Sequence, residues 1–229
     1  GKTTLLASAV EGSPFTTLWY SLGEEDAELA VFLTHLSTAL RRESARYARS
    51  TTAFLREGQL PPRAGATAAG AFLNDLARIR ETLVIVLDDF HLVADSPEIA
   101  RFMALVLENN RTLVRFVLAS RAEPPLPLGR LRARRQLLEF GPADLAFTPE
   151  EYRALFAEVY GRPLAEAELR QVVEFSGGWM APLQLVLHGS LEGIGPRFSE
   201  AVAAARGAHS HLHDYLAGEI VDREEPALR

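Results

Sequence analysis

Cysteine is absent from this 229-residue chain, and so are long apolar runs. Without cysteine, disulfides, thiolate metal sites and cysteine nucleophiles are excluded. The longest apolar runs, such as residues 83–87, are far too short to span a bilayer. The opening Gly1-Lys2-Thr3-Thr4 also differs from a secretory signal, in which a charged segment precedes a long apolar stretch. We therefore expect a cytoplasmic protein with no membrane partner.

A surplus of positive charge is absent as well, because 30 acidic residues outnumber 24 basic ones and the formal net charge is −6. Surfaces that bind duplex DNA normally need a concentrated cationic face. The only basic cluster, Arg130, Arg132, Arg134 and Arg135, has no aromatic residues interleaved with it. A solvated face, or a contact with nucleotide or a neighbouring domain, is the better interpretation. We do not expect this chain to contact DNA itself.

Lysine is almost absent, since Lys2 is the only one and every other basic residue is arginine. A codon bias toward arginine would account for this. A site that needs a compact, mobile ammonium would also resist replacement by a planar guanidinium. The remaining composition is that of a globular protein, with 48% hydrophobic and 24% charged residues.

The first part of the chain alternates between helical and strand patterns. Helices are predicted over residues 3–10, 24–42, 68–80 and 96–108, with a loop and a helical fragment around Phe54 in the uncertain stretch 44–70. Strands are predicted over residues 15–22, 83–87, 113–119 and, as a short extra strand, 136–140. The continuous apolar run 83–87 is typical of a strand buried on both faces of a parallel sheet. This alternation predicts an α/β fold with a parallel sheet.

The pattern changes after Gly141-Pro142. Thr148-Pro149-Glu150-Glu151 has a capping residue, a proline at the first helical position and acids in the first turn, which together predict a helix start. Only helical patterns follow, with breaks at 161–163, 177–178 and 193–196. We therefore predict two domains, an α/β domain over residues 1–145 and an all-helical domain over residues 146–229.

The first four residues match the second half of the Walker A pattern, G-x-x-x-x-G-K-[ST], ahead of a helix. In such loops backbone N–H groups hold phosphate oxygens, the lysine reaches the β and γ phosphates, and the hydroxyl binds Mg²⁺. Gly1, Lys2, Thr3 and Thr4 are therefore candidate nucleotide-binding residues. An ordinary helix start is the alternative, because this short motif also occurs by chance.

Two acids follow the buried strand 83–87, and an arginine follows the strand 113–119. A carboxylate at the end of such a strand is the usual place for an Asp that binds Mg²⁺, so Asp88 is the candidate metal ligand. Asp89 would polarise the attacking water or hold Asp88 in place. Arg121 would contact the γ-phosphate through its guanidinium. The alternatives are acids and an arginine that merely mark strand ends.

Histidines suggest other sites. On a helix only His209 and His213, and not His211, share a face, and no acid is spaced to complete a metal site, so solvated or capping histidines are the better interpretation. His91 follows the acidic pair and has either a supporting role there or a structural one.

Several stretches together resemble the MalT-type signal-transduction ATPases with numerous domains (STAND), often large LuxR-family transcriptional activators. The stretches are Gly1-Lys2-Thr3-Thr4-Leu5-Leu6, Trp19-Tyr20-Ser21-Leu22, Leu87-Asp88-Asp89-Phe90-His91-Leu92, Leu118-Ala119-Ser120-Arg121, Leu131-Arg132-Ala133-Arg134, residues 144–151, Gly178-Trp179, Leu183-Gln184-Leu185 and His213-Asp214-Tyr215-Leu216. The resemblance covers nearly the whole chain.

This resemblance implies a P-loop nucleotide-binding domain followed by a helical lid, acting as an ATP/ADP-Mg²⁺ switch with slow hydrolysis as its reset. Lys2 and Thr3 would bind phosphate and Mg²⁺, Asp88 would bind Mg²⁺, Asp89 would be the catalytic acid and Arg121 the sensor. Pro182 would contact the adenine, since Met180 stands where the family often has proline. The family also implies self-association in the ATP state, with inducer and DNA bound by domains outside this chain.

The family pattern places a central strand and the first Walker A glycine before Gly1. We therefore expect a sheet that lacks a middle strand and a phosphate loop that lacks its first half. This leaves two alternatives, a weak regulatory ATPase and a non-catalytic interaction fragment of the same fold. A P-loop kinase is a third class, for which no acceptor-substrate site is recognisable.

Overall fold

The computed structural model describes residues 2–56, 63–180 and 183, and it contains two compact units. The first, called here the sheet unit, is Lys2–Glu139; the second, called the helical unit, begins at Phe140. The division lies a few residues before residue 145, where the sequence pattern changes. Each unit is described by itself.

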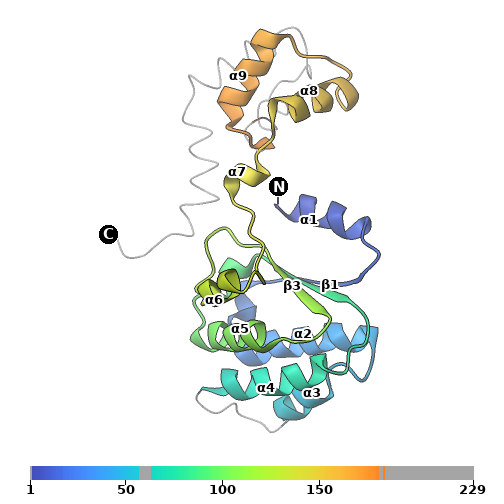
Figure 1. Cartoon of the computed structure of the whole chain (residues 1–229), viewed down its shortest axis with the longest axis vertical. Coiled ribbons are helices and arrows are strands. Elements are labelled where there is room, and N and C mark those ends of the chain that lie inside the picture. The colour runs from blue at the N-terminus through green and yellow to red at the C-terminus, as the bar shows by residue number, and fades with distance from the viewer. Residues whose placement is uncertain (1, 57–62, 181–182, 184–229) are drawn as a thin grey trace, which may run out of the picture. The chain divides into compact units, whose positions relative to one another are not determined.

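The sheet unit is an α/β structure. Its elements are α1 (Lys2–Glu11), β1 (Thr16–Ser21), the 3-10 helix η1 (Glu24–Ala27), α2 (Leu29–Glu43), α3 (Arg49–Arg56), α4 (Ala64–Leu76), β2 (Leu83–Asp88), the 3-10 helix η2 (Phe90–Leu92), α5 (Pro97–Asn109), β3 (Val114–Leu118) and α6 (Leu128–Ala133). The three strands are all parallel and lie in the order β1-β2-β3 (Figure 1). This confirms the predicted α/β class and the predicted strands at 15–22, 83–87 and 113–119.

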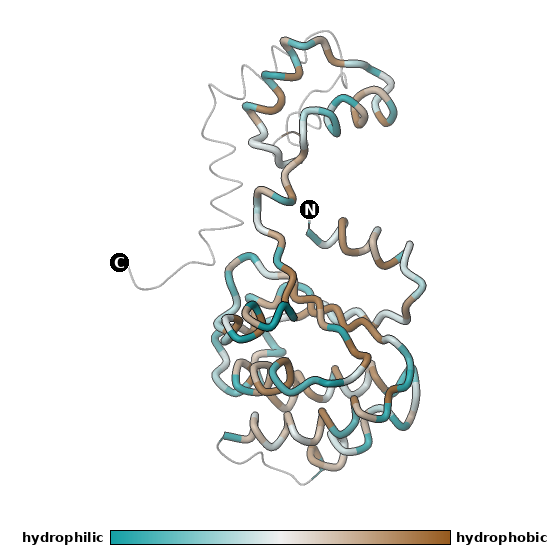
Figure 2. The backbone as a smooth tube through the Cα atoms, viewed as in Figure 1, coloured by the Kyte–Doolittle hydropathy of each residue, from teal (hydrophilic) through white to brown (hydrophobic). Residues whose placement is uncertain are grey.

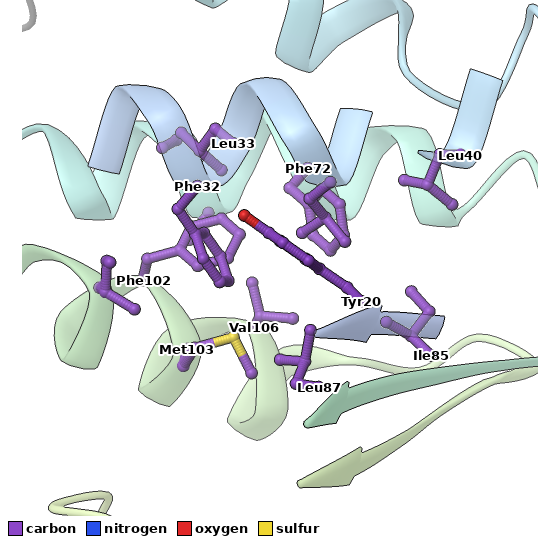
Figure 3. Close-up of a cluster of buried hydrophobic side chains, with 14 of the residues drawn as sticks. Tyr20, Phe32, Leu33, Leu40, Phe72, Ile85, Leu87, Phe102, Met103 and Val106 are labelled. Atoms are coloured by element: carbon purple, nitrogen blue, oxygen red, sulfur yellow. The ribbon is translucent and has the colours of Figure 1, made fainter. Parts of the chain in front are cut away.

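One face of the sheet packs on helices α2, α4 and α5, and this layer is the main core (Figure 3). Leu18 and Tyr20 of β1 alternate with the outward residues of the strand, as do Leu83, Ile85 and Leu87 of β2. The helices contribute an aromatic cluster in which the Phe102 ring lies 5.9 Å from that of Phe32 and 5.4 Å from that of Phe72. This core holds the strand ends in place.

The opposite face of the sheet carries the alternate residues of each strand. On β2 these are Val84, Val86 and Asp88, of which Val86 is fully buried and Asp88 is only 3% exposed. On β1 they include Trp19 and Ser21. Hydrophobic residues predominate along β2 and β3 (Figure 2). Asp88 and Ser21 therefore project from the same face.

No gap separates the three described strands. Leu83–Asp88 pairs with β1 along its whole length and, from Leu83 to Leu87, with β3 on its other side. A buried strand needs partners for the N–H and C=O groups on both edges, and β1 and β3 supply them here. Within the sheet unit, α1 buries none of its residues.

The helix predicted over residues 24–42 is divided in two. Glu28 is extended, with φ −82° and ψ 126°, and separates η1 from α2. The cause is Asp26, whose carboxylate accepts hydrogen bonds from the Gly23 N–H at 2.8 Å and from the Tyr20 hydroxyl at 2.5 Å. These bonds hold a tight turn that a continuous helix would break.

The short strand predicted over residues 136–140 is absent, and this prediction was wrong. Leu138 and Phe140 are 78% and 65% exposed, so their alternating pattern has no sheet to pack against. The Arg132 guanidinium instead binds the Glu139 carboxylate with two hydrogen bonds, of 2.7 and 2.5 Å. Glu139 is thereby tied to α6 rather than to a strand edge.

The helical unit confirms the predicted change to helices within the residues described. Its elements are α7 (Pro142–Leu145), α8 (Pro149–Glu158) and α9 (Glu166–Ser176). The predicted helix start is confirmed, because the Glu151 N–H donates to Thr148 Oγ1 at 3.2 Å and the Thr148 N–H donates to Glu151 Oε2 at 2.7 Å. The core is formed by α8 and α9 residues such as Tyr152 and Phe156.

The predicted breaks at Gly161 and Gly177-Gly178 are confirmed. All three glycines have positive φ angles, of 63°, 56° and 86°, which glycine adopts without steric cost. The predicted break at 193–196 lies outside the described residues. In the part of the chain that is described, no helix is both long and apolar enough to cross a membrane.

Candidate functional site

The candidate site is built on the carboxyl edge of the sheet, where the three parallel strands end. Ser21 lies in register with Asp88, and Leu87 with Leu118. The ladder continues past the strands, since the Ala119 N–H donates to the Leu87 carbonyl at 3.0 Å and the Phe90 N–H donates to the Ala119 carbonyl at 2.9 Å. On the other side the Leu22 N–H donates to the Asp88 carbonyl at 3.1 Å. These bonds hold the Asp88-Asp89 backbone from both neighbouring strands.

Asp88 is a buried carboxylate with few partners to offset the cost of its burial. It is 3% exposed, and its side chain accepts one hydrogen bond among the described residues, from the Asp89 N–H to Oδ1 at 3.0 Å. No ion pair with a described basic residue neutralises it. Burial of an ionised carboxylate costs several kcal/mol unless it is paired or coordinates a cation. The remaining oxygen of Asp88 therefore fits a cation ligand.

Asp89 has an unusual backbone conformation. Its φ of 54° and ψ of 39° lie in the left-handed region, and it is one of the few non-glycine residues described with positive φ. This conformation costs of order 1 kcal/mol for a residue with a Cβ and often occurs at functional sites. The Asp89 side chain is 45% exposed, and its Oδ1 lies 3.8 Å from His91 Nδ1. The turn thus directs one acid inward and the next toward solvent.

Arg121 follows β3 by three residues and is exposed. Because β2 and β3 are parallel, Asp88, Asp89 and Arg121 reach the same edge of the sheet. The structure therefore places Asp88 and Asp89 at the edge where β3 also ends, and Arg121 follows three residues after the end of β3. Their chemical roles remain predictions.

The residues of the phosphate-loop motif lie in the first turn of α1. Lys2 is half-buried, whereas Thr3 and Thr4 are exposed. Among the described residues, no hydrogen bond or ion pair joins Lys2 or Thr3 to Asp88 or Asp89. The first turn of a helix presents free backbone N–H groups, a chemistry that suits phosphate. Gly1 and Pro182 lie outside the described residues.

The comparisons with known proteins concern the whole chain. No protein-family model matches it. It is 31% identical over 233 aligned residues to the HTH-type transcriptional regulator MalT of Cronobacter sakazakii, and 32% identical over 231 aligned residues to the protein of that name from Serratia proteamaculans. Both alignments include 100% of this chain. The chain matches MalT-type regulators.

The alignments cover 25% of each relative, so the chain spans about a quarter of the length of these regulators. This finding confirms the resemblance to the MalT type that the short motifs indicate. Together with the three-stranded parallel sheet, it supports the predicted P-loop type of α/β fold.

A buried polar cluster beside this edge was missed in the sequence. The Tyr20 hydroxyl and His35 Nδ1 both contact Asp26 Oδ1, at 2.5 and 2.8 Å. Burial, and then the hydrogen bond to Asp26, raise the pKa of Tyr20 far above its ordinary value. Burial opposes the ionisation of Asp26, but hydrogen bonds from the Gly23 N–H, Tyr20 and His35 outweigh it and lower the pKa of Asp26. Tyr20 lies in the Trp19-Tyr20-Ser21-Leu22 stretch, but no sequence pattern links it to Asp26 or His35, since contacts between a strand and a helix bring them together.

The basic cluster of this chain is partly neutralised within the sheet unit. Arg132 binds Glu139 and also Glu123, the latter at 2.9 Å. Arg130 lies 3.5 Å from Glu108. Since arginines paired with carboxylates have less charge to offer phosphates, this arrangement favours a structural role over nucleic-acid binding.

The histidines suggested as a metal site, His209, His211 and His213, lie outside the described residues. Within the described ranges, no group of three or more metal-ligating side chains is assembled.

Proposed function

We propose that this chain binds ATP and ADP with Mg²⁺ and acts as the nucleotide-dependent switch region of a transcription regulator. The observation that carries the proposal is the Asp88 carboxylate, 3% exposed and held by a single hydrogen bond at the edge of a parallel sheet. The relatives are named as transcriptional regulators, which supports the regulatory part of the proposal.

The described residues fit a magnesium–nucleotide group in part. Mg²⁺ favours oxygen ligands, usually one or two carboxylates together with phosphates and water, and Asp88 supplies a carboxylate of this kind. Thr3 would add a hydroxyl, and Lys2 would bind phosphate oxygens as a mobile point charge. Bound Mg²⁺ would neutralise charge on the phosphates.

The residues around Asp88 would then divide the remaining tasks. Asp89, half-exposed and held in a left-handed turn, would accept a proton from the attacking water. Arg121 at the end of the neighbouring strand would contact the γ-phosphate and lose that contact after hydrolysis. We propose that slow hydrolysis resets the switch and that the ATP form self-associates. Inducer and DNA would bind to other parts of the regulator.

A second candidate is an interaction fragment of the same fold that binds no nucleotide. The observation in its favour is α1, which buries none of its residues and places Lys2 and Thr3 without a bond to the acidic pair. A phosphate site needs those groups to converge, whereas an interaction fragment does not.

Equilibrium binding of a fluorescent ATP analogue separates the two candidates. It is measured with and without Mg²⁺, on this chain and on the chain extended by the residues its gene encodes ahead of Gly1. We expect Asp88→Asn to remove the Mg²⁺-dependent part of the affinity and Lys2→Ala to abolish binding. Asp95→Asn, at an exposed acid near η2, is the matched control and should leave affinity unchanged. Equal affinity of the parent, Lys2→Ala and Asp88→Asn forms would refute the switch proposal.

A further inference from the structure

Ser21 is the residue of β1 that lies beside Asp88. The two are partners in the parallel register, and each occupies the last position of its strand. Tyr20 and Leu87, the residues before them, both belong to the helix-covered core, so Ser21 and Asp88 project from the opposite face. Neighbouring strands lie about 4.8 Å apart, which places the hydroxyl within reach of any group that the Asp88 carboxylate binds.

The Ser21 hydroxyl accepts a hydrogen bond from a residue of its own strand. The Trp19 indole Nε1–H donates to Ser21 Oγ at 3.1 Å. A serine hydroxyl has one hydrogen to donate and two lone pairs, and the indole can only donate. One lone pair is therefore occupied, and among the described residues no acceptor takes the Ser21 hydrogen. Because Ser21 is exposed, that hydrogen is available to an external oxygen.

Trp19 lies on the same face of β1 as Ser21. It is half-buried and lies in register with Val86, which is fully buried on the same face of the sheet. The indole therefore lies on the face of the sheet that also carries Ser21 and Asp88. The Trp19–Ser21 hydrogen bond alone would also fit a serine whose only role is to accept from Trp19. The ligand is indicated instead by the exposure of the hydroxyl and by its position beside the Asp88 carboxylate, which has no cationic partner among the described residues.

The charge around Ser21 limits the kind of acceptor. Asp88 and Asp89 are both acids, and a free phosphate would be repelled by them. A phosphate oxygen that shares a cation with Asp88 would not be repelled. We propose that the Ser21 hydroxyl, oriented by Trp19, donates a hydrogen bond to a phosphate oxygen of the magnesium–nucleotide group. This proposal rests on the proposed nucleotide-binding function and adds a binding residue to that site.

The test compares Mg²⁺-ATP affinity in variants that differ by one hydroxyl, using the same fluorescent ATP analogue and the same two chain forms. Hydrogen bonds to charged acceptors are strong enough that Ser21→Ala should weaken binding about tenfold. Ser21→Thr keeps the hydroxyl and suits a strand, so it should bind within about twofold of the parent. Trp19→Phe removes the orienting N–H and should weaken binding about threefold.

Thr17→Ala is the matched control. Thr17 lies on the same face of the same strand, but its hydroxyl donates to the Phe15 carbonyl at 3.3 Å and it is far from the strand end. Its loss should leave nucleotide affinity unchanged. Circular dichroism on each variant checks that the fold is retained.

A second measurement identifies the acceptor. Binding of Mn²⁺ alone, followed by its electron paramagnetic resonance signal, should be the same in Ser21→Ala and the parent if phosphate is the acceptor. If Ser21→Ala lost as much affinity for Mn²⁺ alone as for the metal–nucleotide, the assignment of phosphate as the acceptor would be overturned. Parent-like nucleotide affinity of Ser21→Ala would overturn the role of Ser21 and leave the switch proposal standing. Failure of the parent to bind nucleotide in either chain form would overturn both.

Discussion

A substitution at Asp75 tests whether hydrogen bonds between helices stabilise the helical layer that packs on the sheet. Asp75 lies on α4 and is fully buried, yet its carboxylate accepts hydrogen bonds from the backbone N–H groups of Ser50 and Thr51 at 2.9 and 2.8 Å. It also accepts from Thr51 Oγ1 at 2.8 Å and from Arg78 at 2.7 Å. Asp75 thereby caps the first turn of α3 from a neighbouring helix.

We expect Asp75→Ala to destabilise the sheet unit by about 3–5 kcal/mol. The change leaves two backbone N–H groups and one hydroxyl without an acceptor, and each such group costs about 1–3 kcal/mol when buried. Thr51 is fully buried, whereas Ser50 is half-buried and can recover part of its loss from water. Arg78 is 46% exposed, so its ion pair adds little.

Urea unfolding followed by circular dichroism measures this loss. With a slope of about 2 kcal/mol/M, the midpoint should fall by about 2 M. Hydrogen exchange gives a local check, because the amides of Ser50 and Thr51 should lose protection before the strands do. Asp95→Asn is the control for an exposed acid. A midpoint for Asp75→Ala within about 0.3 M of the parent would show that the cap does not stabilise this layer.

Two further predictions concern packing and pH. A Cβ on Gly65 would lie 2.5 Å from the Glu98 carbonyl oxygen, so Gly65→Ala should destabilise by about 1–3 kcal/mol. Gly70→Ala, in the same helix with nothing within 4 Å, should stabilise by about 0.5–1 kcal/mol. Urea midpoints that move in the same direction for both would contradict this packing argument. Because the pKa of Asp26 is lowered in the folded state, its ionised carboxylate adds to the free energy of unfolding. This stabilisation is fully present above the ordinary aspartate pKa and is lost as the pH falls through the lowered pKa of the folded state. Asp26→Asn should therefore be less stable than the parent at neutral pH, with a difference that shrinks on acidification; a constant difference would refute the linkage.

Much of the sheet unit follows from local patterns in the chain. The run Leu83–Leu87 is apolar at every position, so it can be stable only as a strand covered on both faces, and the structure buries it. Thr148 begins a helix because its hydroxyl and the Glu151 carboxylate exchange hydrogen bonds three residues apart. Interactions of this range depend on neighbours in the sequence and can be predicted from it.

The errors arise where distant residues decide the outcome. Residues 136–140 have a strand-like pattern, but a strand needs an edge to pair with, and the Arg132–Glu139 contact holds the segment elsewhere. Asp26 interrupts a helical pattern because Tyr20 and His35 converge on it from a strand and another helix. A periodicity argument contains no information about such contacts.

The sequence by itself determined the class of fold, the strand that ends at Asp88, and the acids and arginine at or after the strand ends, because each depends on residue type and short-range spacing. Only the tertiary structure decided that Asp88 is buried with one hydrogen bond, that Asp89 is left-handed, and that Ser21 shares the face and edge of Asp88. The physical reason is strand pairing, since the register between separate strands places side chains next to one another that lie far apart along the chain.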